Sequence, residues 1–268
     1  MTTAREQMGD AVLAKVPAIT VGFWIIKVLA TTLGETGGDT VSMTLNWGYL
    51  AATGLFAAIL VALVWAQIAA SRFHPFLYWV TIVASTTAGT TMADFATRSL
   101  GIGYTGGSLL LLSLVLISLF AWHRTMGTVN VNKIVTPRAE TFYWITITFS
   151  QTLGTALGDW LADSGGFGYI GAAAVFSGAL AICAALYWFT STSRVGLFWA
   201  AFILTRPLGA AVGDFLDKPT DHGGLALSRP LASAVLAVAI VLLIMLLPQR
   251  AGQHPGSENK KPEMKPVV

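Results

Sequence analysis

The chain has 268 residues, of which 54% are hydrophobic and 11% are charged, a balance that a soluble domain of this length rarely shows and that indicates an integral membrane protein. Its net charge of +3 needs no nucleic-acid partner, because membrane topology and anionic lipid headgroups account for the basic excess. The single cysteine, Cys183, excludes an internal disulfide, a thiolate metal cluster and a CxxC redox motif.

Long apolar segments follow a polar start. Residues 1–16 have no hydrophobic core of their own, so they are predicted as a cytoplasmic N-terminal segment and not as a cleavable signal peptide. A helix needs roughly 20 residues to cross a hydrocarbon layer of about 30 Å. Eight segments reach that length and are predicted as transmembrane helices, at 17–41, 47–70, 76–98, 103–123, 139–162, 167–190, 195–216 and 227–247.

The connections and chain ends predict the orientation. The longest internal connection, 125–138, and the polar, Pro-rich tail, 248–268, are both expected in the cytoplasm, the tail as a disordered segment. Most Lys and Arg residues outside the spans fall on the side of the two termini, and the other side has only Arg98, Lys218 and Arg229. By the positive-inside rule, both termini are cytoplasmic.

The first span of every pair repeats one sequence pattern. The stretches "FWIIKVLATTLGETGGD", "YWVTIVASTTAGTTMAD", "YWITITFSQTLGTALGD" and "FWAAFILTRPLGAAVGD" share an aromatic residue, a Trp, a Gly and a final Asp in one register. A further Gly follows nine residues after each Asp, and a Tyr comes next in three copies. The anchors are Trp24, Gly34, Asp39 and Gly48; Trp79, Gly89, Asp94 and Gly103; Trp144, Gly154, Asp159 and Gly168; and Trp199, Gly209, Asp214 and Gly223. A register that holds without a gap in four copies indicates internal repeats.

Each repeat contains two spans, so all four copies enter the membrane from the same side. The chain is therefore predicted to be an all-α membrane protein of eight transmembrane helices, arranged as four parallel two-helix repeats. The longer connection after repeat 2 divides it into two pseudo-symmetric halves, with repeats 1 and 2 in residues 17–124 and repeats 3 and 4 in residues 139–247. The four equivalent aspartates are then expected to face a common axis.

Polar residues share a helix face with the aspartates, at positions four, seven and eight residues before each Asp. A single Thr in a membrane helix often bonds a carbonyl of its own helix, but recurrence in three repeats favours a role in lining a pathway. Besides Glu35, the candidate lining residues are Thr31, Thr32, Thr86, Thr87, Thr90, Gln151, Thr152 and Thr155. Repeat 4 departs from the pattern with Arg206, Pro207 and Ala210, which predicts that it closes or gates one side.

A second stripe consists of small residues ten and fourteen positions after each Trp. The spacing is the small-xxx-small pattern that lets helix backbones approach closely in lipid, so we interpret these residues as packing and not as chemistry. They are Gly34 and Gly38, Gly89 and Ala93, Gly154 and Gly158, and Gly209 and Gly213.

The aspartates carry an energetic penalty that needs an explanation. A charge at the bilayer centre costs at least about 2.5 kcal/mol, and an anion is disfavoured near a helix C-terminus. A bound cation, proton uptake or basic partners would each offset the penalty. Acids outnumber the bases of the spans, which are Lys27 and Arg206 with Arg98 at an edge. An alternative of equal weight for any single Asp is that it caps the connection that follows.

The carboxylates predict a cation site formed by Asp39, Asp94, Asp159 and Asp214, with Glu35 beside it. Lys27 and Arg206 lie deeper than the aspartates and are predicted as internal counter-charges that gate the path, and Arg206 is expected to meet Glu35 or the Thr columns. Oxygen ligands favour Mg²⁺, Ca²⁺ or Mn²⁺ over Zn²⁺ or Cu⁺. We expect no tightly bound cofactor, and a divalent metal enters only as a candidate substrate.

Enzymatic activity is not expected. All four histidines fall in connections or in the tail, which excludes a haem held between helices. The sequence has no P-loop, nucleophile elbow or HExxH motif, and four equivalent aspartates do not single out the catalytic pair of an intramembrane protease.

The pattern "FW…LG…GD…GY", which extends over residues 17–247, resembles a family of bacterial multi-repeat integral membrane proteins described as uncharacterised membrane-anchored proteins. The resemblance implies the repeat architecture and a location in the bacterial inner membrane. It implies no particular activity.

The leading hypothesis is a membrane transporter of a divalent cation such as Mn²⁺ or Mg²⁺, bound by the four aspartates. One alternative is a proton-coupled carrier of a small organic solute, and another is a non-transporting scaffold or sensor in which acids and bases form a structural network. The expected partners are the lipid bilayer and the transported ion, without nucleic acid, and the sequence is compatible with a homo-oligomer.

Overall fold

The computed structural model describes residues 15–134 and 136–252. In these ranges the chain is all-helical, and its only β-type pairing is an isolated bridge between Pro17 and Ala251. The helices are α1 (Val21–Asp39), α2 (Gly48–Ala69), α3 (Pro75–Asp94), α4 (Gly103–Met126), α5 (Pro137–Asp159), α6 (Gly168–Phe189), α7 (Arg194–Asp217) and α8 (Arg229–Leu246). The eight predicted segments agree with these bounds to within a few residues. The predicted N-terminal segment, 1–16, and tail, 248–268, lie largely outside the described residues.

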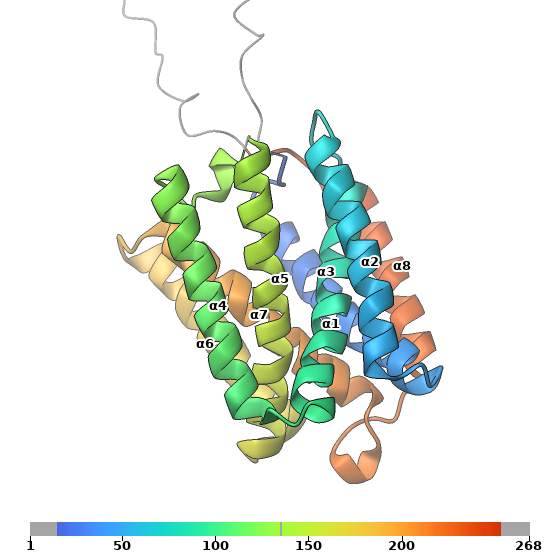
Figure 1. The fold of residues 1–268 in the computed structure, drawn as a ribbon. Coiled ribbons are helices and arrows are strands. Elements are labelled where there is room, and N and C mark those ends of the chain that lie inside the picture. The colour runs from blue at the N-terminus through green and yellow to red at the C-terminus, as the bar shows by residue number, and fades with distance from the viewer. Residues whose placement is uncertain (1–14, 135, 253–268) are drawn as a thin grey trace, which may run out of the picture.

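The first helices of the four repeats form a closed inner ring. Helix α1 packs against α3, α3 against α5, α5 against α7, and α7 against α1. The second helices lie outside this ring (Figure 1): α2 packs on α3, α4 on α5, α6 on α7, and α8 on α1. Each second helix therefore packs chiefly against the first helix of the next repeat, and α8 closes the circle.

Glycines set the distance between neighbours in the inner ring. In each inner helix, the Gly ten residues after the Trp contacts the next inner helix. The residue that it contacts there lies seven positions after the Trp of that second helix. The four pairs are Gly34 with Thr86, Gly89 with Gln151, Gly154 with Arg206, and Gly209 with Thr31. A Cβ on any of these glycines would overlap with the partner residue, which confirms the packing role predicted for the small-residue stripe.

Apolar surface covers the outside of the bundle. Helices α2, α4, α6, α7 and α8 are long and apolar enough to cross a membrane. Large apolar side chains on the outer helices are exposed, among them Trp65, Phe120, Ile182 and Leu242. The polar columns are on the inner helices α1, α3, α5 and α7. This distribution suggests a membrane protein, with lipid against the outer helices.

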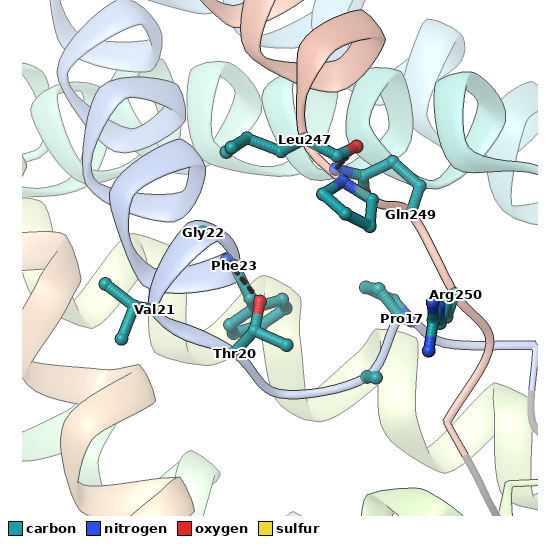
Figure 2. A pocket seen from close by; sticks show the side chains of 10 residues that line it. Pro17, Thr20, Val21, Gly22, Phe23, Leu247, Gln249 and Arg250 are labelled. Atoms are coloured by element: carbon teal, nitrogen blue, oxygen red, sulfur yellow. Dashed lines mark hydrogen bonds between the residues drawn. The ribbon is translucent and has the colours of Figure 1, made fainter.

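The two described chain ends lie together at one end of the bundle, where Pro17 pairs with Ala251. Figure 2 shows the hollow between the segment that enters α1 and the segment that leaves α8. In the same view the Thr20 hydroxyl accepts a hydrogen bond from the Phe23 N–H at 3.2 Å and so caps the start of α1.

Gly89→Ala tests the close approach of α3 to α5. The added methyl group would lie about 2.9 Å from backbone atoms of Gln151 and Thr152, and a helix backbone cannot move aside as a flexible side chain can. We expect the variant to lose roughly 1–3 kcal/mol of unfolding free energy, measured by denaturant unfolding in detergent.

Gly54→Ala on α2 is the matched control, because a Cβ at Gly54 meets no atom within 4 Å. It should be neutral or slightly stabilising, since Ala is the better helix former. Equal losses in the two variants would contradict the packing role of Gly89.

Candidate functional site

Five buried layers of equivalent residues follow the inner ring at intervals of four residues along each helix. From the end that holds the chain termini, they are Phe23, Tyr78, Tyr143 and Phe198; Lys27, Ile82, Ile147 and Phe202; Thr31, Thr86, Gln151 and Arg206; Glu35, Thr90, Thr155 and Ala210; and Asp39, Asp94, Asp159 and Asp214. The bundle therefore changes from aromatic at one end to acidic at the other.

The aromatic layer closes its end of the inner ring. The hydroxyl groups of Tyr78 and Tyr143 lie 2.6 Å apart across the α3–α5 contact. Trp144 packs against both tyrosine rings, with centroids 5.9 Å and 5.1 Å away. Aromatic contacts of this kind favour a tightly packed layer.

Arg206 lies in the centre of the bundle and joins all four inner helices. Its Nη1 and Nη2 atoms both donate to Glu35 Oε2 at 3.0 Å. Nη2 also donates to Thr155 Oγ1 at 2.6 Å and to the Thr90 hydroxyl. The predicted meeting of Arg206 with Glu35 and the Thr columns is confirmed, and a fully buried guanidinium thus has a carboxylate and several oxygens around it.

Lys27 lies one layer deeper and has different partners. Its Nζ atom is 3.5 Å from Gln151 Oε1 and 4.2 Å from the centre of the Phe202 ring. No described carboxylate lies within ion-pair distance of Lys27. Of the two predicted internal counter-charges, Arg206 is thus the one that pairs with an acid in this structure.

Two bases bridge the four aspartates in pairs. Arg98 Nε lies 3.1 Å from Asp94 Oδ1, and its Nη2 donates to Asp159 Oδ2 at 3.2 Å. Lys218 Nζ lies 3.0 Å from Asp214 Oδ1 and 2.6 Å from Asp39 Oδ2. Each base therefore connects the Asp of its own repeat, four residues earlier, to the Asp of the next repeat.

Glu35, Asp39 and Asp214 form the tightest acidic group. One carboxylate oxygen from each lies within 4.8 Å of the others, and all three side chains are buried. Asp39 Oδ1 has no hydrogen-bond partner among the described residues, and Asp214 Oδ1, although close to Lys218, lacks a well-directed hydrogen bond. Three carboxylates with free acceptor positions can hold a metal ion of the kind that prefers oxygen ligands.

Lys218 follows the last residue of α7 and is largely covered by these acids. Burial alone would lower the pKa of its ammonium group, but the carboxylates of Asp214, Asp39 and Asp217 outweigh burial and raise this pKa well above its ordinary value. The three carboxylates thus favour the charged form of Lys218. A second base, Arg229 at the start of α8, lies 3.2 Å from Asp217 Oδ2.

The Thr columns divide into two kinds. The hydroxyls of Thr32, Thr87 and Thr152, eight residues after each Trp, donate to carbonyls of their own helices at 2.8–3.1 Å. By contrast, Thr90 and Thr155 contact Arg206, and Thr31 also donates to the Thr205 carbonyl across to α7. Thr31, Thr90 and Thr155, which belong to the layers, thus form hydrogen bonds with other helices. The hydroxyls eight residues after each Trp are bonded within their own helices.

Three of the ring aspartates are the last α-helical residues before a π-helical turn. After Asp39, Asp94 and Asp159 the chain continues as a five-residue π-helical turn, and none of these side chains makes a capping hydrogen bond. The capping alternative for them is therefore wrong. Because a π-turn widens the helix by one residue, it also changes the direction in which the following side chains project.

Lys218 and Arg229 are the site residues that the sequence interpretation missed. Both were counted on the outer side of the membrane and used only for orientation. The signal was present, because Lys218 follows Asp214 by the same four residues that separate Arg98 from Asp94. Two side chains at that spacing share one helix face.

A family model described as "Repeat of Unknown Function (DUF347)" matches the chain four times, at residues 22–73, 77–128, 142–193 and 197–250. Each match contains one of the four predicted repeats, which confirms the repeat architecture. No curated protein and no solved structure matches the chain.

The buried pair of Glu35 and Arg206 can be tested by a double-mutant cycle. Either Glu35→Gln or Arg206→Met leaves one buried charge without its partner, which should cost about 3–5 kcal/mol of unfolding free energy. The double variant should lose much less than the two single losses combined, because no uncompensated charge remains. Additive losses in detergent unfolding would contradict a coupled pair.

Proposed function

Because the chain belongs to the DUF347 repeat family, which its four repeats establish, we propose a function from the site that these repeats build: membrane transport of a cation, such as the divalent metals Mn²⁺ or Mg²⁺. The observation that carries the proposal is the group of three buried carboxylates, Glu35, Asp39 and Asp214, whose oxygens lie within 4.8 Å of one another. Transport requires neither catalysis nor a tightly bound cofactor.

All eight helices cross the membrane in this proposal, with the acidic layer toward the outside and both chain ends in the cytoplasm of a bacterium. The inner helices α1, α3 and α5 are less apolar than the others because they carry the polar layers, and the outer helices shield them from lipid. The distribution of Lys and Arg in the sequence supports the orientation.

Charge at the acidic end supports a cation as the ligand. Among the residues that the structure describes, five buried aspartates, the four of the ring and Asp217, have only Arg98, Lys218 and Arg229 as basic partners within ion-pair distance. Glu35 is neutralised separately by Arg206. Two negative charges thus remain without compensation, and such charges are costly in an apolar surrounding. One divalent cation or two protons would balance them.

Carboxylate and hydroxyl oxygens surround the place where a cation would bind. Hard cations such as Mg²⁺ and Mn²⁺ prefer these ligands, and no His or Cys side chain lies in the five layers to favour a softer metal. Below the aspartates, the Glu35–Arg206 pair and the aromatic layer occupy the path toward the chain ends. Conduction therefore requires that both rearrange, which is typical of a carrier and not of an open channel.

Two other functions are the alternatives that an experiment must separate. A proton-coupled carrier of a small organic solute would use the same carboxylates for two protons. A scaffold or sensor would use acids and bases only to hold the helices together, and the ion pairs at Arg98, Lys218 and Arg206 favour this second alternative over a purely metal-filled ring.

Metal binding and transport are tested on purified protein with a panel of divalent cations. At 100 times its dissociation constant, a metal that binds only the folded protein should stabilise it by about 2.7 kcal/mol, seen as a shift in thermal unfolding. The same metal should enter liposomes that contain the protein. Asp39→Asn or Asp214→Asn should weaken binding by about tenfold or more, because each removes a ligand charge.

Asp221→Asn is the matched control, since Asp221 is an exposed acid near the same end of the bundle. It should leave both readouts unchanged. If no divalent cation stabilises the wild-type protein and the Asn variants behave as wild type, the cation proposal is wrong, and a proton-driven solute flux would then favour the carrier alternative.

A further inference from the structure

One repeat position determines how the aspartate ring is neutralised. The residues that follow each ring aspartate by four positions are Met43, Arg98, Asp163 and Lys218. Bases thus occur in repeats 2 and 4, whose inner helices α3 and α7 are not neighbours and lie opposite each other in the ring. The ring therefore consists of two half-sites, each with two aspartates and one base.

The two half-sites differ in how the base is held. Arg98 uses separate nitrogen atoms for Asp94 and Asp159, and its Nη1 also donates to the Tyr49 hydroxyl at 3.4 Å. Lys218 uses one atom: Nζ lies 2.6 Å and 3.0 Å from oxygens of Asp39 and Asp214. A guanidinium is a rigid planar fork, whereas an ammonium is a compact point charge on a flexible stem. The Lys218 ammonium is thus placed as a single bound ion would be.

The acids also differ between the half-sites. Beside Asp39 and Asp214 lies a third carboxylate, Glu35, whereas the equivalent residue beside Asp94 and Asp159 is Thr155. Of the two half-sites, as far as the described residues show, the Lys218 half-site alone has three carboxylates within 4.8 Å. Asp39 Oδ1, which is fully buried and without a hydrogen-bond partner, points to a ligand at this half-site that the lysine alone does not satisfy.

We propose that Lys218 is the resident cation of the Glu35–Asp39–Asp214 site and that a divalent metal binds there by displacing its ammonium group, while Arg98 stays in place as a fixed counter-ion of the opposite half-site. The inference rests on the proposed cation transport and adds how that site is kept occupied between transport events. It also replaces the earlier expectation that Lys27 or Arg206 is the movable charge.

Hydrogen bonds hold the backbone around Lys218 in place, so the proposed displacement is a movement of its side chain. The connection after α7 is bonded back to the helix end: Leu225 N–H donates to the Phe215 carbonyl at 2.8 Å, and Ala226 N–H donates to the Lys218 carbonyl at 2.9 Å. Gly224 is needed here, because a Cβ would overlap with the Lys218 backbone. Rotation about the side-chain bonds of Lys218 is then sufficient to free the site.

The charge balance selects a divalent ion. With Glu35 paired to Arg206, the Lys218 half-site has three acids, Asp39, Asp214 and Asp217. Two bases, Lys218 and Arg229, lie within ion-pair distance of them, so the half-site carries one negative charge. Replacing the ammonium by a monovalent cation leaves that charge, whereas a divalent cation removes it. Charge alone therefore favours the exchange of Lys218 for a divalent metal over its exchange for Na⁺ or K⁺.

The test compares Lys218→Met with Arg98→Met, two variants at equivalent repeat positions, by equilibrium binding of Mn²⁺ to the purified full-length protein. Loss of the competing ammonium should tighten Mn²⁺ binding about tenfold, the size of one close charge contact, whereas Arg98→Met should not tighten it. Lys218→Arg should weaken Mn²⁺ binding, because the larger guanidinium group is displaced from the carboxylates less readily than an ammonium group. This charge-conserving variant also serves if Lys218→Met does not fold.

A second measurement follows the displaced side chain directly. Acylation of lysines by an amine-reactive reagent, read by mass spectrometry, should label Lys218 several-fold faster when Mn²⁺ is saturating, while the exposed Lys133 is labelled at the same rate with and without metal. Wild-type binding of Mn²⁺ with unchanged Lys218 labelling and no tightening in Lys218→Met would overturn the displacement and leave the cation proposal standing. Absence of Mn²⁺ binding in the wild type and in all variants would overturn both.

Discussion

Carboxylates inside an apolar bundle keep their charge only where positive charge reaches them, and this requirement explains the placement of Arg98, Arg206 and Lys218 beside the buried acids. The inner ring buries five acids on the layers, and each has a base at 3.2 Å or less: Arg206 for Glu35, Arg98 for Asp94 and Asp159, and Lys218 for Asp39 and Asp214. A buried acid without such a partner would destabilise the fold by several kcal/mol. Charge compensation thus connects the helices as much as apolar packing does.

Close backbone contact makes this compensation geometrically feasible. The glycine contacts repeat around the ring, so that Gly34, Gly89, Gly154 and Gly209 each receive the equivalent residue of the next helix. Because the inner helices approach so closely, side chains on different helices come within hydrogen-bond distance. Arg206 of α7 can therefore contact Glu35, Thr90 and Thr155 on three other helices. The repeats supply the symmetry of the backbone, whereas the charged residues Glu35, Arg98, Arg206 and Lys218 occupy positions where the four copies differ.

The sequence was sufficient to predict the helices, the repeats and the packing role of the glycines, because each leaves a periodic pattern in the chain. It also predicted that Arg206 meets Glu35 or the Thr columns, from their depths along the helices, and Arg206 contacts both. It did not reveal which helices are neighbours. Each second helix packs on the first helix of the next repeat, as α2 does on α3, and such tertiary contacts leave no local pattern in the sequence. Lys218 was missed for a related reason, since hydropathy assigned it to a connection although its spacing from Asp214 matched that of Arg98 from Asp94.

The difference between repeats at the position of Lys218 determines what the acidic end can bind. If all four copies had a base there, the ring would be neutral and would have no need of an ion. If none had one, the ring would carry four negative charges and could fold only with bound cations or protons. With bases in two opposite copies, each half-site has one base between two ring aspartates, and one negative charge of each pair remains uncompensated. Glu35, whose counterparts in the other three repeats are uncharged, then places a third carboxylate beside Lys218, at the half-site where we propose that a metal binds.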